Sequence, residues 1–165
     1  MDIAAYAQRV RESRQEGRCF ICSIVSGTDS LGHQVVYENT GTIVFLSLYP
    51  TLLGYCLAAP KRHIEDWVRE LDEPEFLALQ QVVHRVAQAV AAAVPTERMY
   101  SLSLGSRQGN AHLHWHIAPL PPGCPLTSSS ITRSWAKTAS WTSMTAPRPP
   151  SHGLSGISCN RGGES

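Results

Sequence analysis

The chain has 165 residues, a length that suits one domain with a sizeable buried core. Its formal net charge is +1, and no uninterrupted apolar stretch reaches the roughly 20 residues of a membrane helix. Composition therefore argues against a protein that binds nucleic acid or crosses a membrane. Residues 1–14 lack the charged-then-apolar order of a secretory signal, so we expect a cytoplasmic protein.

The first part of the chain predicts a short helix, a turn and three strands. Residues 3–13 have a helix-compatible composition and few apolar anchors, which predicts a surface helix, and residues 17–22 predict a turn. Clusters of β-branched and aromatic residues, bounded by glycine and proline, predict strands at 34–38, 42–48 and 54–59.

A long helix is predicted to begin after Asp72, which suits an N-cap. Glu75 stands three residues later, where a capping box places an acid. Apolar residues then recur at spacings of three and four, which predicts a helix of about 20 residues that Pro95 stops. The apolar stripe consists of Phe76, Leu79, Val82, Val83, Val86 and Val90. Two more strands are predicted, at 99–104 and 111–118.

The composition changes after Gly123. Pro119 is expected to end the last strand, and residues 124–165 are rich in Ser, Thr, Pro and Gly. This predicts one domain at 1–123 followed by a disordered tail. Back-translated with GC-rich codons and read one base earlier, residues 127–145 become D-Q-Q-Q-Y-H-A-L-M-G-E-N-G-V-L-D-V-D-D, which looks more like ordinary protein. A frameshift in the gene or its sequencing is therefore one hypothesis for this tail.

His112, His114 and His116 alternate along the last predicted strand and therefore share one face of it. The residues between them are apolar and belong in the core. Neutral imidazole is a good nucleophile near neutral pH and forms covalent phosphoramidates, and the loop at 105–110 brings further donors to a phosphate. Incidental surface histidines and a metal-only H-x-H site are the alternatives that the pattern leaves open.

Cys19 and Cys22 form a C-x-x-C pair, which in a cytoplasmic chain indicates metal or redox chemistry. A pair of unrelated thiols is the alternative. The odd total of five cysteines argues against a secreted disulfide framework. Cys56 lies in a predicted strand and is expected to be a small buried residue.

The run H-L-H-W-H-I-A at 112–118 resembles the signature of the histidine triad (HIT) family. The C-x-x-C pair, the V-Y-E segment at 36–38 and the A-P-K-R-H-I segment at 59–64 follow the same family's order and spacing. The resemblance covers residues 18–119. It implies an α+β fold with a five-stranded antiparallel sheet and one long helix, assembled as a homodimer.

The resemblance also implies that the protein transfers or hydrolyses nucleotidyl groups. His114 would be the nucleophile, and His116 would contact the phosphate. Substrates would be nucleoside phosphoramidates, such as an adenosine or other purine phosphoramidate, or related nucleotides. A catalytically weak nucleotide- or protein-binding module and a dinucleoside polyphosphate hydrolase or phosphorylase are the alternative functions.

Five further residues would bind substrate: four stand where the family places substrate-binding positions, and the fifth, Asn110, ends the loop that brings donors to a phosphate. The family's loop glutamine is Gln108, and its usual polar neighbour is replaced by Gly109. The acid that binds the ribose in the family is replaced by Ser47, and the asparagine at the end of the fourth strand is replaced by Ser103. The substrate-binding set is Ser47, Ser103, Gln108, Gly109 and Asn110. A histidine that the family has beside the third strand is Tyr55 here.

A zinc-binding branch of the family carries the C-x-x-C pair. By this resemblance, one structural zinc ion per chain would be held in a closed tetrahedral site. Its ligands would be Cys19, Cys22, His63 and His112. The remaining histidines match nothing in the family's motifs and are expected to be ordinary surface residues. They are His33, His84 and His152.

Overall fold

The computed structural model describes residues 8, 17, 19–48, 50, 52–103 and 110–123. The helix predicted at 3–13 lies outside the described residues except for Gln8, which is helical. The predicted tail at 124–165 also lies outside them. Among the helices that are described, none has both the length and the apolar composition needed to cross a bilayer.

Five strands form one antiparallel sheet, as predicted, in the order β1-β2-β3-β5-β4. The strands are β1 Val35–Glu38, β2 Thr42–Leu46, β3 Cys56–Pro60, β4 Arg98–Leu102 and β5 Trp115–Leu120. Consecutive strands β1 to β3 pair as a meander, whereas β5 inserts between β3 and β4. The chain therefore has the α+β architecture that its sequence predicts, with β5 in the interior of the sheet.

Three described helices accompany the sheet, namely α2 Phe20–Val25, α3 Trp67–Glu70 and α4 Glu73–Ala93. The capping box of α4 is present, because Asp72 accepts from the backbone N–H of Glu75 and the Glu75 carboxylate accepts from that of Asp72. The turn predicted at 17–22 is wrong in its second half. Cys19 is instead the N-cap of α2, and its Sγ accepts from the backbone N–H of Cys22.

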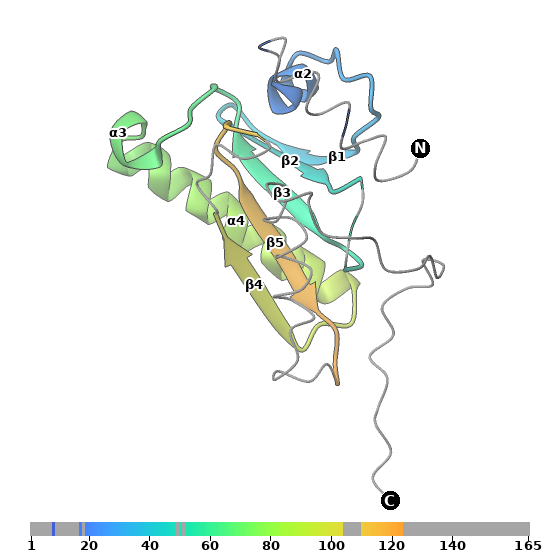
Figure 1. Ribbon diagram of the computed structural model, residues 1–165. Coiled ribbons are helices and arrows are strands. Elements are labelled where there is room, and N and C mark those ends of the chain that lie inside the picture. The colour runs from blue at the N-terminus through green and yellow to red at the C-terminus, as the bar shows by residue number, and fades with distance from the viewer. Residues whose placement is uncertain are drawn as a thin grey trace, which may run out of the picture.

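The sheet carries a different apolar layer on each face. Helix α4 lies along one face (Figure 1), where Val44, Trp115 and Ile117 pack with its apolar stripe. On the other face, beside β1 and β2, helix α2 contributes Ile21 and Ile24 to a second layer. The apolar residues between the histidines therefore lie in the core, as predicted, on the face that α4 covers, and His116 lies on the opposite face of β5.

The last strand begins later than predicted. It starts at Trp115, so His112 and His114 lie on the irregular segment that precedes β5, with a bend at His112. It also continues through Pro119, which pairs with Met99 of β4 beyond the last residue that pairs with β3. Because one side of β5 is unpaired there, the missing N–H of proline is tolerated.

The prediction that His33 is an ordinary surface residue is wrong, since only 2% of its side chain is exposed. Its ring stacks on Phe20 and meets the edge of Phe45, each at a centroid distance of 5.4 Å. The Asp29 carboxylate lies 3.0 Å from Nδ1 of His33 and accepts from the backbone N–H of Leu31 and of His33. His84 is exposed on α4, as predicted, and His152 lies outside the described residues.

Candidate functional site

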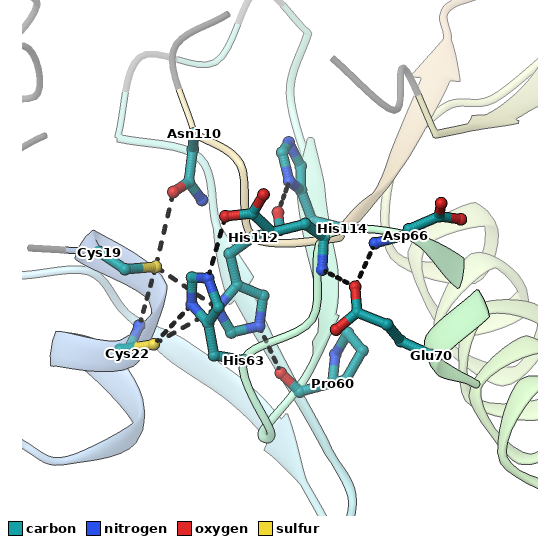
Figure 2. A network of polar contacts seen from close by, with 10 residues as sticks. Cys19, Cys22, Pro60, His63, Asp66, Glu70, Asn110, His112 and His114 are labelled. Carbon is teal, nitrogen blue, oxygen red and sulfur yellow. Dashed lines mark hydrogen bonds and ion pairs between the residues drawn. The ribbon is translucent and has the colours of Figure 1, made fainter. Parts of the chain in front are cut away.

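The structure brings two cysteines and two histidines together from three distant segments (Figure 2). One ligand atom from each of Cys19, Cys22, His63 and His112 lies within 4.8 Å of all the others. Nδ1 of His63 lies 3.2 Å from the sulfur of Cys22, and Nδ1 of His112 lies 3.4 Å from the sulfur of Cys19. The C-x-x-C pair on α2 thus meets the loop after β3 and the segment before β5.

Both histidines of this cluster turn the same nitrogen toward the sulfurs. Nε2 of His112 lies 2.9 Å from the carbonyl oxygen of Pro60, and a carbonyl oxygen only accepts. Nε2 of His112 therefore carries the hydrogen, and the lone pair of Nδ1 faces the cysteines. Nε2 of His63 lies 3.5 Å from a carboxylate oxygen of Glu65, a distance at which the negative charge favours a hydrogen on Nε2. Outer partners of this kind orient histidines that bind metals.

The four donors fit a divalent cation. Burial raises the pKa of Cys19 to about 11 and lowers the pKa of His112 to about 4, so the cluster favours neutral groups when no cation is present. A neutral imidazole is ready to ligate, and a bound cation reverses the cost of ionising a thiol. A set of two thiolates and two imidazoles suits a closed tetrahedral site.

Asn110, expected among the substrate-binding residues, lies beside the cysteines. Its Oδ1 is 3.5 Å from the sulfur of Cys19 (Figure 2). Its Nδ2 is buried and has no hydrogen-bond partner in the part of the chain that the structure describes. The side chain of Asn110 therefore adjoins the four residues Cys19, Cys22, His63 and His112, called the metal-type cluster below. The sequence alone did not predict this placement.

His114 lies beside the cluster but has a separate environment. Nδ1 of His114 is 2.7 Å from the carbonyl oxygen of His112, so this nitrogen donates its hydrogen and Nε2 keeps a lone pair. Burial lowers the pKa of His114, which keeps the ring neutral near neutral pH. Its ring centroid lies 4.8 Å from that of His116.

His116 is buried in β5 and meets Tyr55. The hydroxyl oxygen of Tyr55 lies 2.8 Å from Nδ1 of His116, and the two rings meet edge to face. Burial lowers the pKa of His116 to about 3, with a further contribution from His114, and burial raises the pKa of Tyr55 to about 12. Both groups are therefore neutral near neutral pH.

The remaining expected site residues fall in two groups. Ser47 follows β2, and its backbone N–H donates to the carbonyl oxygen of Tyr55. Ser103 follows Leu102, which pairs with His116, and its hydroxyl is buried with no partner among the described residues. Both serines thus adjoin residues that meet His116. Gln108 and Gly109 lie outside the described residues.

Known proteins match both the sequence and the fold of this chain. Residues 30–122 match the family model of the HIT domain. An uncharacterized HIT-like protein of Saccharolobus solfataricus is 32% identical over 104 residues, which cover 61% of this chain and 73% of that protein.

Two solved structures are also similar. One is a hypothetical histidine triad nucleotide-binding protein from Sulfolobus tokodaii, with a TM-score of 0.57 and 32% identity over 67% of this chain and 75% of that one. The other is a Zn-bound histidine triad family protein from Mycobacterium smegmatis, with a TM-score of 0.58 and 24% identity. That likeness covers 64% of this chain and 76% of the other and concerns the fold.

Proposed function

The chain belongs to the histidine triad (HIT) family, and from that premise we propose that it is a nucleotidyl hydrolase or transferase. The bond it cleaves is the P–N bond of a nucleoside phosphoramidate or a related P–O bond. The observation that carries this proposal is the hydrogen bond from Nδ1 of His114 to the carbonyl oxygen of His112. It leaves Nε2 of a neutral imidazole as a nucleophile.

The reaction proceeds in two steps. Nε2 of His114 attacks the phosphorus, the P–N bond of the substrate breaks, and the leaving nitrogen takes a proton from water and departs as an amine. The carbonyl oxygen of His112 keeps accepting from Nδ1 and thereby stabilises the positive charge that the ring gains. Water then attacks the nucleotidyl-histidine and gives a proton to the hydroxide left by the first step, the bond from Nε2 to phosphorus breaks with its electron pair returning to Nε2, and the nucleoside monophosphate leaves.

The other proposed site residues bind the substrate around this nucleophile. His116 contacts the phosphate. Gln108 and Gly109 contact the phosphate or its leaving group, whereas the side chain of Asn110 lies beside Cys19. Ser47 and Ser103 make the contacts to the nucleoside and the remaining contacts to the phosphate. Each hydroxyl offers one hydrogen bond, and neither makes the charge-assisted contact of a carboxylate.

We propose that the cluster of Cys19, Cys22, His63 and His112 holds one structural zinc ion. The support is the donor set, the tautomer of His112 that Pro60 selects, and the position of Glu65 beside Nε2 of His63. Bound zinc supplies a fixed cross-link between α2 and the segment that carries His114, and it takes no part in the chemical steps.

The proposed assembly is a homodimer that acts in the cytoplasm on a nucleotide substrate. Light scattering coupled to size-exclusion chromatography tests the dimer directly, with a mass of twice 18.0 kDa as the expected result. A single chain mass at micromolar concentration would contradict it.

A variant at His114 tests the proposed activity. His114→Ala removes the nucleophile, so we expect turnover of an adenosine phosphoramidate to fall by at least about a thousandfold. His84→Ala, which changes an exposed histidine on α4, serves as the matched control and should keep full activity. Parallel assays with diadenosine tetraphosphate measure whether dinucleoside polyphosphates are better substrates. Undiminished turnover by folded His114→Ala would refute the assignment.

A further inference from the structure

The hydroxyl of Tyr55 contacts His116, although the two residues are 61 positions apart in the sequence. Tyr55 immediately precedes β3. It directly follows Gly54, whose φ of +80° turns the chain into β3. The phenol is buried, and its oxygen lies 2.8 Å from Nδ1 of His116. Among the described residues, no other hydrogen-bond partner of this hydroxyl is present.

The direction of this hydrogen bond follows from counting hydrogens. A neutral imidazole carries one N–H, so Nδ1 of His116 either accepts from Tyr55 or donates to it. If Nδ1 donated, the hydroxyl hydrogen of Tyr55 would be buried without an acceptor in the described part of the chain. An unpaired buried donor is costly, whereas donation to Nδ1 satisfies both groups.

Donation from Tyr55 to Nδ1 determines which nitrogen of the His116 ring carries the hydrogen. Because Nδ1 accepts, the single hydrogen of the neutral ring resides on Nε2, the nitrogen on the far side from Tyr55. The ring of His114 lies 4.8 Å away and has the opposite arrangement, with its hydrogen on Nδ1. The neighbouring rings therefore differ in chemistry, since Nε2 of His114 has a lone pair and Nε2 of His116 has an N–H.

We propose that Tyr55 is a positioning residue whose hydroxyl donates to Nδ1 of His116 and holds that ring as the Nε2–H tautomer, a fixed hydrogen-bond donor to the phosphate oxygen. The inference rests on the proposed function for the identity of the acceptor, a nucleotidyl phosphate. The tautomer itself is a property of the resting protein. Tyr55 does not touch the reacting atoms and acts through His116 alone.

A nitrogen-15 NMR measurement on the zinc-supplemented full chain tests the tautomer without any substrate. The His116 signals are identified by their loss in His116→Gln. We expect Nε2 to show the shift of a protonated ring nitrogen and Nδ1 that of an unprotonated acceptor. A protonated Nδ1 in the unmodified protein would overturn the inference, whether or not any variant folds.

Tyr55→Phe removes only the hydroxyl and is assayed with an adenosine phosphoramidate. We expect the His116 signals to move toward a tautomer mixture and kcat to fall about tenfold, the value of one ordinary hydrogen bond, while KM changes little. Tyr37→Phe removes an exposed hydroxyl from β1 and is the matched control. Unchanged His116 signals and kcat in Tyr55→Phe would overturn the inference.

The two readouts separate this inference from the proposed function. If the unmodified protein fails to turn over the phosphoramidate while His116 has the expected tautomer, the proposed function fails and the control of the His116 tautomer by Tyr55 stands. If turnover depends on His114 but His116 carries its hydrogen on Nδ1, the positioning role fails and the proposed function stands.

Discussion

In each histidine of the triad, one ring nitrogen forms a hydrogen bond with a group of the protein, and the other ring nitrogen does not share that partner. Nε2 of His112 donates to Pro60, and Nδ1 of His114 donates to His112. Nδ1 of His116 meets Tyr55. The remaining nitrogen of His112 faces the cysteine sulfurs, and in the proposed reaction those of His114 and His116 meet the phosphate. Under that proposal, three residues of one type have three roles.

The burial of His116 predicts a stability that falls at acidic pH. Its pKa is lowered from 6.5 to about 3, so the unfolded chain binds a proton more readily than the folded one. The contribution of His116 is therefore fully present above pH 6.5 and is lost as the pH falls toward 3. Between pH 7 and pH 5, we expect His116 to contribute a loss of about 2 kcal/mol.

Urea unfolding of the unmodified protein and of His116→Gln at both pH values measures this loss. Other titrating groups, the metal ligands included, act in both proteins and cancel in the comparison. The unmodified protein should lose more stability on acidification than the variant does. An equal loss in the two proteins would show that His116 titrates normally in the folded state.

At the scale of elements, the connection between β2 and β3 is held against α4 at Gly54. The backbone there has a φ of +80°, and a Cβ would lie 3.2 Å from a methyl group of Val90 and 3.3 Å from one of Val94. A side chain at this position would be strained by the left-handed backbone and crowded by the helix. The turn thus fixes the start of β3 and with it the position of Tyr55.

Gly54→Ala should therefore lower the free energy of unfolding by about 1–2 kcal/mol, the cost of a left-handed backbone with a Cβ. The matched control is Gly41→Ala in the turn between β1 and β2, where φ is not positive and a Cβ would meet no atom within 4 Å. Denaturant unfolding measures both variants. Equal stability of the two would contradict the strain assigned to Gly54.

The elements that the sequence predicted well are those whose determinants are local. Helix α4 was predictable because Asp72 and Glu75 form its capping box within one turn and its apolar stripe repeats. The four-residue helix α3, Trp67–Glu70, is too short for any periodicity to appear. His33 looked exposed because its partners Phe20 and Phe45 come from α2 and β2, which only the fold brings to it.

The site shows the same division. The histidine alternation and the C-x-x-C pair are local, and the metal-type cluster unites residues that the family resemblance had already joined. The partners that select each tautomer were not predictable, because Pro60 and Tyr55 lie 52 and 61 residues from the histidines they meet. Asn110 is a second example of a contact that the sequence did not predict. Its position in the sequence indicated a substrate-binding residue, whereas its side chain contacts Cys19.

For the whole molecule, the metal-type cluster joins α2 to the loop after β3 and to the segment before β5, and the last two are also linked by the hydrogen bond from the backbone N–H of Leu113 to the carbonyl oxygen of Ile64. Cys19 packs against the apolar layer to which α2 contributes, whereas His112 is next to Leu113 of the layer on α4. A cation held there would connect the two faces of the sheet. Because such a site exists only in the folded chain, the free energy of binding adds to the stability of the fold.

Removal of the metal should therefore lower the stability of the entire domain. With zinc at a thousand times its Kd, binding contributes about 4 kcal/mol, so we expect a chelator to lower Tm by about 10 °C or more. Elemental analysis should find one zinc ion per chain, lost in Cys19→Ser and kept in Cys56→Ala, a buried cysteine outside the cluster. Full zinc content in folded Cys19→Ser would contradict the proposed ligand set.

The covalent intermediate on His114 is the central claim, and trapping it is the most direct test. The full chain is mixed with an adenosine phosphoramidate, quenched within one turnover without strong acid, and analysed by mass spectrometry of the intact protein and its peptides. We predict a mass gain of one adenosine monophosphoryl group on His114, absent from His114→Ala. Rapid product formation with no such adduct, or with the adduct on another residue, would contradict the account.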